Sequence, residues 1–146
     1  SLYGDFYLPV FEKTIDKGLQ QGKKPREYYK PGWLGNYFVN SMRPKGSTIP
    51  NPMKTFKDKN PVLISVPVHA ADRFLAQQKQ LLALLTKAQR TDIKKLRIPT
   101  TLGSFPKISL GDGFAFVIAH EERHLLQAQR VMEELGTQPK AQLKWS

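Results

Sequence analysis

Apolar residues recur at intervals of three and four in three long stretches of the chain, which is the spacing of one face of an α-helix. The first stretch runs from the start of the sequence to about Leu19, and Pro9 inside it predicts either a kink, which we favour, or a helix start near that residue. The second runs from about Val68 to Gln89, and the third from Leu110 to Leu135. The second stripe comprises Ala71, Phe74, Leu75, Gln78, Leu81, Leu82, Leu85 and Ala88.

The third helix has the clearest boundary signals. Ser109, followed three residues later by Asp112, resembles a capping box at its start. Gly136 follows the last periodic residue and predicts a left-handed stop. Upstream, we expect Thr91 to cap a short helical continuation through Leu96.

The segment from Gly22 to Pro67 is basic and rich in proline, so it predicts a long crossover rather than another long helix. Its aromatic content is too high for a segment that stays disordered, and we expect it to be ordered. The apolar island GWLGNYFVNSM predicts a helix of two or three turns. PVLISVPV is the only strand candidate, and IPTTLGSFPKI is interpreted as a loop.

These elements predict an all-α protein with a single domain over residues 1–146. Three long helices and a long crossover are typical of a four-helix bundle seen without one of its helices. Because the first apolar pattern opens partway through a helix, we expect the first helix of the bundle to be missing from this chain. The domain is then incomplete at its N-terminus.

Composition narrows the chemistry and the partners. The chain contains no cysteine, so any metal must be held by nitrogen and oxygen. No apolar run approaches the ~20 residues of a membrane span and no secretory signal is visible, so we expect a cytoplasmic protein without a membrane partner. The net charge is +11, but residues 1–60 carry 11 basic and 5 acidic side chains and residues 61–146 carry 12 and 7. This even spread disfavours a nucleic-acid partner.

His120 and His124 lie four residues apart in the third helix, within FAFVIAHEERHLLQAQRVMEEL. At about 100° per residue they fall within roughly 40° of each other, on a stripe shared with Val117, Ala128, Val131 and Leu135. We therefore expect both to face the interior and to present their nitrogens to a common cation. The alternative is that each is an ordinary core histidine or a partner of Glu121 or Glu122.

The pair also spells H-E-x-x-H, the zinc-protease signature in which Glu121 would be the general base. That interpretation needs a third ligand downstream. Glu133 and Glu134 lie on the same helix, about 14 Å away at 1.5 Å per residue, and cannot turn back to the metal. The protease hypothesis is accordingly the weaker one. His69, the only other histidine, lies about 140° from its helix's core stripe and predicts a surface position.

The segment LGSFPKISLGDGFAFVIAHEERHLLQAQRVME resembles the last part of the DinB-like superfamily, in particular its DinB_2-type members. These proteins carry a pattern close to H-x-x-R-H-x-x-Q on the last helix, after a small-residue turn and a capping serine. Here the pattern is His120, Arg123, His124 and Gln127. The match is specific over about 35 residues and looser over the rest of the chain.

The resemblance implies a four-helix bundle of up-down-down-up topology that binds a divalent metal, zinc, nickel or iron, through three histidines. Two of these carry over to His120 and His124. The third would come from helix two and would precede Ser1. Glu121 is a candidate partner of the ligands, whereas Arg123 and Gln127 are expected to form structural pairs with a neighbouring helix.

The leading functional hypothesis is a DinB-like metal-binding protein that acts as a metal-dependent transferase or hydrolase on a small molecule, with a thiol as one candidate substrate. The resemblance also makes a homodimer an option. A non-catalytic helical binding module is the main alternative. A basic nucleic-acid binder and a zinc protease are the remaining ones.

Overall fold

The computed structural model describes residues 2–49, 69–101 and 103–136. Four helices and one hairpin make up this part of the chain, so the prediction of a helical bundle is confirmed and a small sheet is added to it. The helices are α1 (Leu2–Gln20), α2 (Trp33–Met42), α3 (Ala70–Ala88) and α4 (Leu110–Glu134), and the strands are β1 (Arg97–Thr100) and β2 (Gly103–Ser109).

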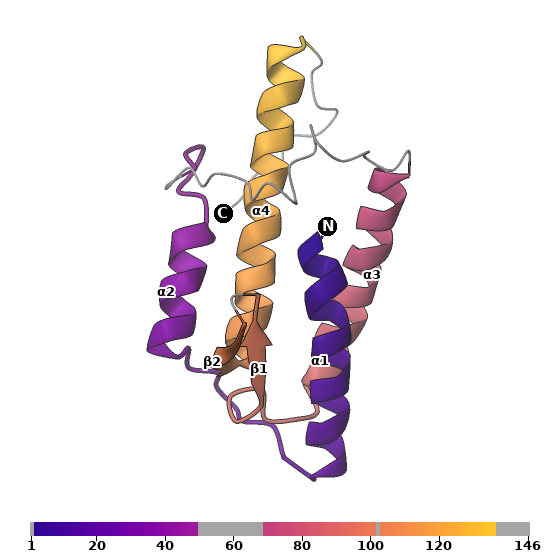
Figure 1. The fold of residues 1–146 in the computed structure, drawn as a ribbon, viewed down its shortest axis with the longest axis vertical. Helices are drawn as coiled ribbons and strands as arrows, with labels where there is room; N and C mark the ends of the chain where they lie inside the picture. The colour runs from indigo at the N-terminus through magenta and orange to yellow at the C-terminus, as the bar shows by residue number, and fades with distance from the viewer. Residues whose placement is uncertain (1, 50–68, 102, 137–146) are drawn as a thin grey trace.

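Figure 1 shows α4 between α2 and α1, with α3 on the far side of α1. Helices α1 and α3 run in one direction and α2 and α4 in the other. The hairpin lies across the half of α4 where that helix begins. None of the helices in the described ranges is long and apolar enough to cross a membrane.

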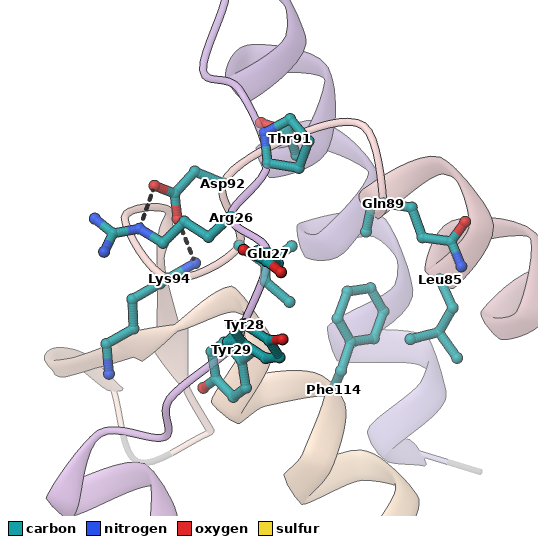
Figure 2. Close-up of a pocket in the computed structure, with 13 residues that line it drawn as sticks. Arg26, Glu27, Tyr28, Tyr29, Leu85, Gln89, Thr91, Asp92, Lys94 and Phe114 are labelled. Carbon is teal, nitrogen blue, oxygen red and sulfur yellow. Dashed lines mark hydrogen bonds and ion pairs between the residues drawn. The ribbon is translucent and has the colours of Figure 1, made fainter.

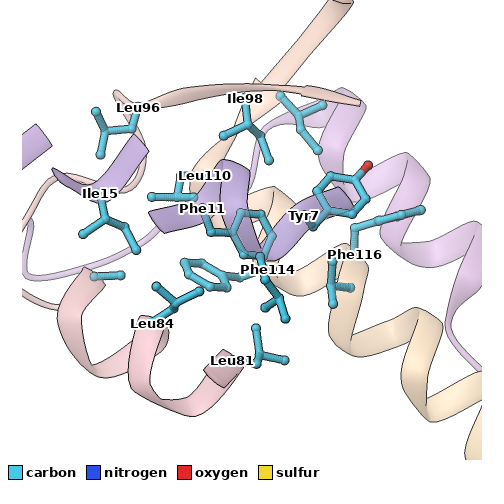
Figure 3. Close-up of a cluster of buried hydrophobic side chains, with 14 of the residues drawn as sticks. Tyr7, Phe11, Ile15, Leu81, Leu84, Leu96, Ile98, Leu110, Phe114 and Phe116 are labelled. Carbon is cyan, nitrogen blue, oxygen red and sulfur yellow. The ribbon is translucent and has the colours of Figure 1, made fainter. Parts of the chain in front are cut away.

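The core forms where α1, α3, α4 and the hairpin meet (Figure 3). Tyr7, Phe11 and Ile15 recur at intervals of four on α1 and are almost completely buried, as the periodicity predicted. The Phe11 ring packs against Phe114 of α4, with 4.4 Å between the ring centroids. Leu84 of α3 lies on the opposite side of this aromatic pair from the hairpin.

The hairpin corrects the interpretation of residues 98–108 as a loop. Strands β1 and β2 pair antiparallel, with Ile98 opposite Ile108, and both isoleucine side chains are buried. The pairing is irregular between Ile98 and Thr100, where Pro99 cannot donate a ladder hydrogen bond. Short strands interrupted by proline do not show the alternating pattern that would have predicted them. The other strand candidate, PVLISVPV, lies outside the described residues.

The residues between α3 and β1 form a turn, so the predicted helical continuation from Thr91 to Leu96 is wrong. Asp92 accounts for the difference. Its carboxylate accepts the backbone N–H groups of Lys94 at 3.1 Å and Lys95 at 3.2 Å. These bonds offer the backbone a local alternative to the helical pattern.

Helix α3 buries a narrower face than its apolar pattern predicted. Leu81 and Ala88 are buried as expected, but Leu75 and Leu82 are 58% and 65% exposed. Leu84, which was not part of the predicted stripe, is 4% exposed. The helix packs mainly on α1 at the edge of the bundle, and one neighbour covers only one narrow strip of a helix.

The start of α4 is held by a small polar cluster that confirms and extends the capping prediction. Ser109 Oγ accepts the backbone N–H of Asp112 at 3.1 Å and donates to its carboxylate at 2.7 Å. Tyr29 donates its hydroxyl to the same carboxylate at 2.5 Å, and Gly32 donates its backbone N–H at 3.1 Å. These bonds attach the crossover to α4. Gly35 of α2 also packs on this cluster, and a Cβ there would fall 2.1 Å from the Asp112 carboxyl carbon.

The far end of α4 departs from the predicted stripe. Gly136 has a φ of 70°, so the predicted left-handed stop is confirmed. Val131 and Leu135, however, are 53% and 73% exposed among the described residues, and Ala128 is exposed as well. The interior face of α4 therefore ends close to the second histidine.

Candidate metal site

The two histidines of α4 converge as their spacing predicted. One helical turn separates His120 from His124, and their Nε2 atoms lie 2.9 Å apart. The ring planes are nearly perpendicular, at 85°, with 4.4 Å between centroids. Both rings thus direct the same nitrogen to one point.

The two rings differ in their surroundings. His120 is 9% exposed, because the aromatic rings of Tyr3 and Phe116 cover it. The Tyr3 ring of α1 is the closer one, with its centroid 4.0 Å from that of the imidazole. His124 lies at the edge of the bundle and is exposed. The prediction that both rings face the interior therefore holds for His120 alone.

Gln127 fixes which nitrogen of His124 carries the proton. Its side-chain oxygen Oε1 lies 2.9 Å from His124 Nδ1, so Nδ1–H donates to that oxygen. In a neutral imidazole the other nitrogen then has a free lone pair. His124 Nε2 therefore accepts a hydrogen bond from His120 Nε2–H, and in a metal site both Nε2 atoms would be free to act as ligands.

Both imidazoles are neutral at physiological pH, because His120 is buried and the more exposed His124 is still partly desolvated where it contacts its neighbours. Loss of hydration lowers the pKa of His120 to about 4, and the positive charges of His124 and Arg123 add to this effect. Burial also lowers the pKa of His124, although the bond from Gln127 opposes the shift. Neutral imidazole is the form that binds metal ions, so protons do not compete strongly for these nitrogens at pH 7.

The donor set fits part of a metal site. Two imidazole nitrogens that share one tetrahedral metal at ~2.0–2.1 Å lie roughly 3.3 Å apart, a few tenths of an ångström more than the observed 2.9 Å. His120 Nδ1 is buried and has no hydrogen-bond partner among the described residues. Within those residues, no group of three or more His, Cys, Asp or Glu side chains is close enough together to hold a metal ion. The pair supplies two ligands of such a set.

Glu121 lies next to the pair in sequence and is 6% exposed. Burial raises the pKa of its carboxyl, and the Gln78 side chain of α3 opposes this shift. The Gln78 Nε2 atom nevertheless has no hydrogen-bond partner of good geometry in the described part of the chain. Glu121 therefore faces α3 in a poorly hydrated position between two helices.

The remaining sequence candidates lie apart from the pair. His69 is exposed at the start of α3, 3.3 Å from Asp72, as predicted. Glu122 is 3.9 Å from Arg43 of the segment after α2. Glu133 lies on the exposed end of α4 and accepts a bond from Gln129 at 3.1 Å.

Two contributions to the site were not anticipated from the sequence. Tyr3 lies in the first apolar stretch, where nothing in the spacing indicates that its ring covers His120. Gln127 was expected to pair with a neighbouring helix, but it bonds to His124 on its own helix. The three-residue spacing from His124 to Gln127 was the available signal, because residues three apart are neighbours on a helix surface.

The comparison with protein families gives a match that contains the histidine pair. A family model described as the DinB superfamily matches residues 10–128, which include both histidines and Gln127. Searches of curated proteins and of solved structures gave no match.

Proposed function

Since the chain belongs to the DinB superfamily, whose members often bind a metal ion, we propose that His120 and His124 are ligands of a divalent metal, zinc, nickel or iron. In this proposal the protein is a metal-dependent transferase or hydrolase that acts on a small molecule. A thiol is one candidate substrate, because a metal held by imidazoles with open positions can bind and acidify a thiol.

The observation that carries the proposal is the 2.9 Å approach of the two Nε2 atoms. Two neutral imidazoles directed at one point, with one of them held in a fixed tautomer by Gln127, form a donor pair that is ready for a cation. Without a metal, the same contact is a hydrogen bond in which His120 Nε2–H donates to His124 Nε2, and a bound metal would replace that proton.

The chemistry follows from the ligands and their surroundings. A divalent metal held by imidazole, with open positions, lowers the pKa of a bound water or thiol. The protein residues supply the rest of the site. Tyr3 and Phe116 exclude water from the buried side of His120, and Gln127 keeps the His124 lone pair directed toward His120. The net charge of +11 favours the approach of an anionic substrate.

Metal analysis of the full-length protein tests the proposal. Purified protein is stripped with a chelator and titrated with Zn²⁺, Ni²⁺ or Fe²⁺ by competition with a coloured chelator. The His120→Ala and His124→Ala variants should each lose at least about 100-fold in affinity, because each removes a metal ligand. His69→Ala is the matched control, since it removes an exposed histidine outside the pair.

The outcomes separate the proposal from its alternative. Equal metal content and affinity in wild type, His120→Ala and His124→Ala would overturn it and favour a non-catalytic helical binding module. Circular dichroism of each variant checks that the helices remain. A loss of affinity in His69→Ala as large as in the other two variants would also contradict the assignment.

A further inference from the structure

A pocket lies at the end of the bundle where α4 begins. It has a volume of about 350 Å³ and is enclosed by the crossover after α1, the end of α3, the turn before β1 and the first turns of α4 (Figure 2). Phe114, which lines it, is six residues before His120, or roughly 9 Å along the helix axis. The pocket is therefore separate from the histidine pair.

One side of the pocket is apolar. Phe114 is 4% exposed and Ala88 is equally buried, and Leu85 completes the same wall. Figure 2 shows Phe114, Leu85 and Gln89 on one side and Arg26 and Lys94 on the other. The Tyr28 side chain, 78% exposed, adds an aromatic surface at the mouth. A volume in this range and a largely apolar lining suit a small organic molecule.

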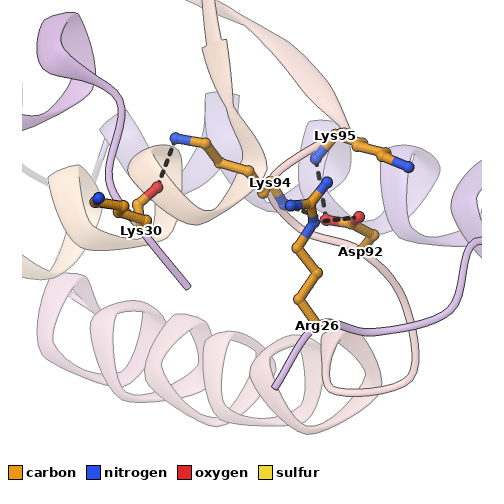
Figure 4. Close-up of polar contacts among 5 residues, drawn as sticks. All are labelled: Arg26, Lys30, Asp92, Lys94 and Lys95. Atoms are coloured by element: carbon orange, nitrogen blue, oxygen red, sulfur yellow. Dashed lines mark hydrogen bonds and ion pairs between the residues drawn. The ribbon is translucent and has the colours of Figure 1, made fainter. Parts of the chain in front are cut away.

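The other side of the pocket carries two cations and two carboxylates, because the fold places two charged segments side by side (Figure 4). The backbone N–H of Asp92 donates to Lys23 O at 3.3 Å, and Lys94 Nζ donates to Lys30 O at 2.5 Å. Of the basic side chains on these segments, Arg26 and Lys94 line the pocket. These residues are distant in sequence, and the even spread of charge along the chain concealed them.

Both of these cationic side chains have N–H donors that remain available to a ligand. Arg26 uses its Nε to bind Asp92 at 2.8 Å, and the side chain is still 52% exposed, so the outer edge of the guanidinium faces solvent. Lys94 Nζ makes one bond to a backbone oxygen, and an ammonium group has three N–H donors.

Two carboxylates also line the pocket, and they act differently. Asp92 accepts bonds from Arg26 Nε and from the backbone N–H groups of Lys94 and Lys95, so its charge is compensated. Glu27 is exposed. Its charge opposes the binding of an anion, and its removal should strengthen such binding.

We propose that this pocket is a second binding site, which takes a small organic anion: its aromatic or aliphatic body lies against Phe114 and Leu85, and its carboxylate, sulfonate or phosphate group binds Arg26 and Lys94. The combination of an apolar wall and a cationic rim selects for both parts of such a molecule. Neither part alone would fill the site.

The test uses the full chain with 2-naphthalenesulfonate as the probe and 2-naphthalenesulfonamide as its uncharged counterpart. Amide chemical shifts in ¹H–¹⁵N spectra report where each binds. The sulfonate should shift the amides of residues 26–29, 89–94 and 114 and bind about tenfold more tightly than the sulfonamide, because it makes charge-assisted bonds. Lys94→Met should weaken sulfonate binding by about tenfold and leave sulfonamide binding unchanged. Glu27→Gln should strengthen sulfonate binding.

A control variant, a second variant of the pocket and a competing ligand complete the test. Lys79→Met removes an exposed lysine of α3 that does not line the pocket, and it should leave sulfonate binding unchanged. Arg26→Gln is the second rim variant, checked for folding by thermal unfolding. Equal affinity for the sulfonate and the sulfonamide would overturn the proposal, as would shifts confined to other regions. Displacement of the sulfonate by an oligothymidylate of ten nucleotides would overturn the small-anion proposal and indicate a nucleic-acid binding surface.

Discussion

The ring of Tyr3 lies 4.0 Å, centroid to centroid, from the imidazole of His120, so α1 forms the wall that separates the buried histidine from water. The contact explains why two histidines on one helix face have different surroundings. His124 is one turn further along α4 and is exposed at the edge of the bundle. The electrostatic state of the pair therefore depends on a residue from another helix.

Replacement of Tyr3 by alanine should raise the pKa of His120 from about 4 toward its ordinary value of 6.5. The reason is that burial is the main cause of the lowered pKa, and removal of the ring admits water. Titration of the imidazole proton resonances in metal-free protein measures the shift. Tyr3→Phe keeps the ring and should leave the pKa low. An unchanged value in Tyr3→Ala would mean that Tyr3 does not shield His120.

The buried His120 should make the metal-free protein less stable as the pH falls from 6.5 to 4. In this window the unfolded chain binds a proton on His120 and the folded chain does not, so the free energy of unfolding decreases with decreasing pH. The shift corresponds to a loss of up to about 3 kcal/mol. Urea unfolding of wild type and His120→Leu at several pH values measures the difference between them.

Other titratable groups also change the free energy of unfolding with pH, and the comparison of wild type with His120→Leu separates their effects from that of His120. The pKa of Glu121 is raised by burial, so its protonation favours the folded state as the pH falls, which is the opposite sign. Its contribution is present in both proteins and largely cancels. Asp92 has a lowered pKa, although its burial alone would raise it, so it stabilises the fold at higher pH and loses that contribution only as the pH falls below its ordinary value of 3.8. Parallel curves for wild type and His120→Leu would contradict the prediction.

Tyr29→Phe should destabilise the protein by about 1–3 kcal/mol, because it removes a hydroxyl that donates to a buried carboxylate. The lost bond is the 2.5 Å contact with Asp112, and the 2.9 Å contact with Ser109 is lost as well. Denaturant unfolding at pH 7 measures the effect. Tyr28→Phe changes the neighbouring tyrosine, which is 78% exposed, and should stay within ~0.5 kcal/mol of wild type. Similar stability of the two variants would show that this cluster does not fasten the crossover.

Periodicity predicted the helices because each has an apolar face that another element covers. The cap at Ser109 could also be predicted, since its hydrogen bonds run to a residue only three positions away. The hairpin could not be predicted from the sequence, because Pro99 and Pro106 interrupt the alternating pattern of its short strands. Leu82 shows the limit of periodicity. It fits the helical pattern of α3, yet no described element covers it and it is 65% exposed.

At the candidate sites, too, contacts between residues close in sequence could be predicted, and contacts between distant residues could not. The convergence of His120 and His124 follows from their spacing on one helix, and it was predicted. The contact of Tyr3 with His120, and the meeting of Arg26 with Lys94 at one pocket, join residues far apart in sequence. A single sequence contains no periodic signal for such contacts, since they depend on how the helices and turns pack.

The side-chain oxygen of Gln127 accepts a hydrogen bond from Nδ1–H of His124. Gln127→Leu removes that acceptor and keeps a side chain of similar size on an exposed position. The proton of His124 is then free to occupy either nitrogen, so the fraction with Nδ1 protonated should fall. Imidazole ¹⁵N chemical shifts at pH 7.5 in metal-free protein measure this fraction directly.

Metal affinity should fall by about 10–100-fold, which is the usual effect of losing a hydrogen-bond partner of a metal-binding histidine. Gln129→Leu is the matched control, because Gln129 bonds to Glu133 at 3.1 Å on the same helix and does not contact the pair. A tautomer that changes without loss of metal affinity would show that the proton on His124 is set by Gln127 but that His124 is not a ligand.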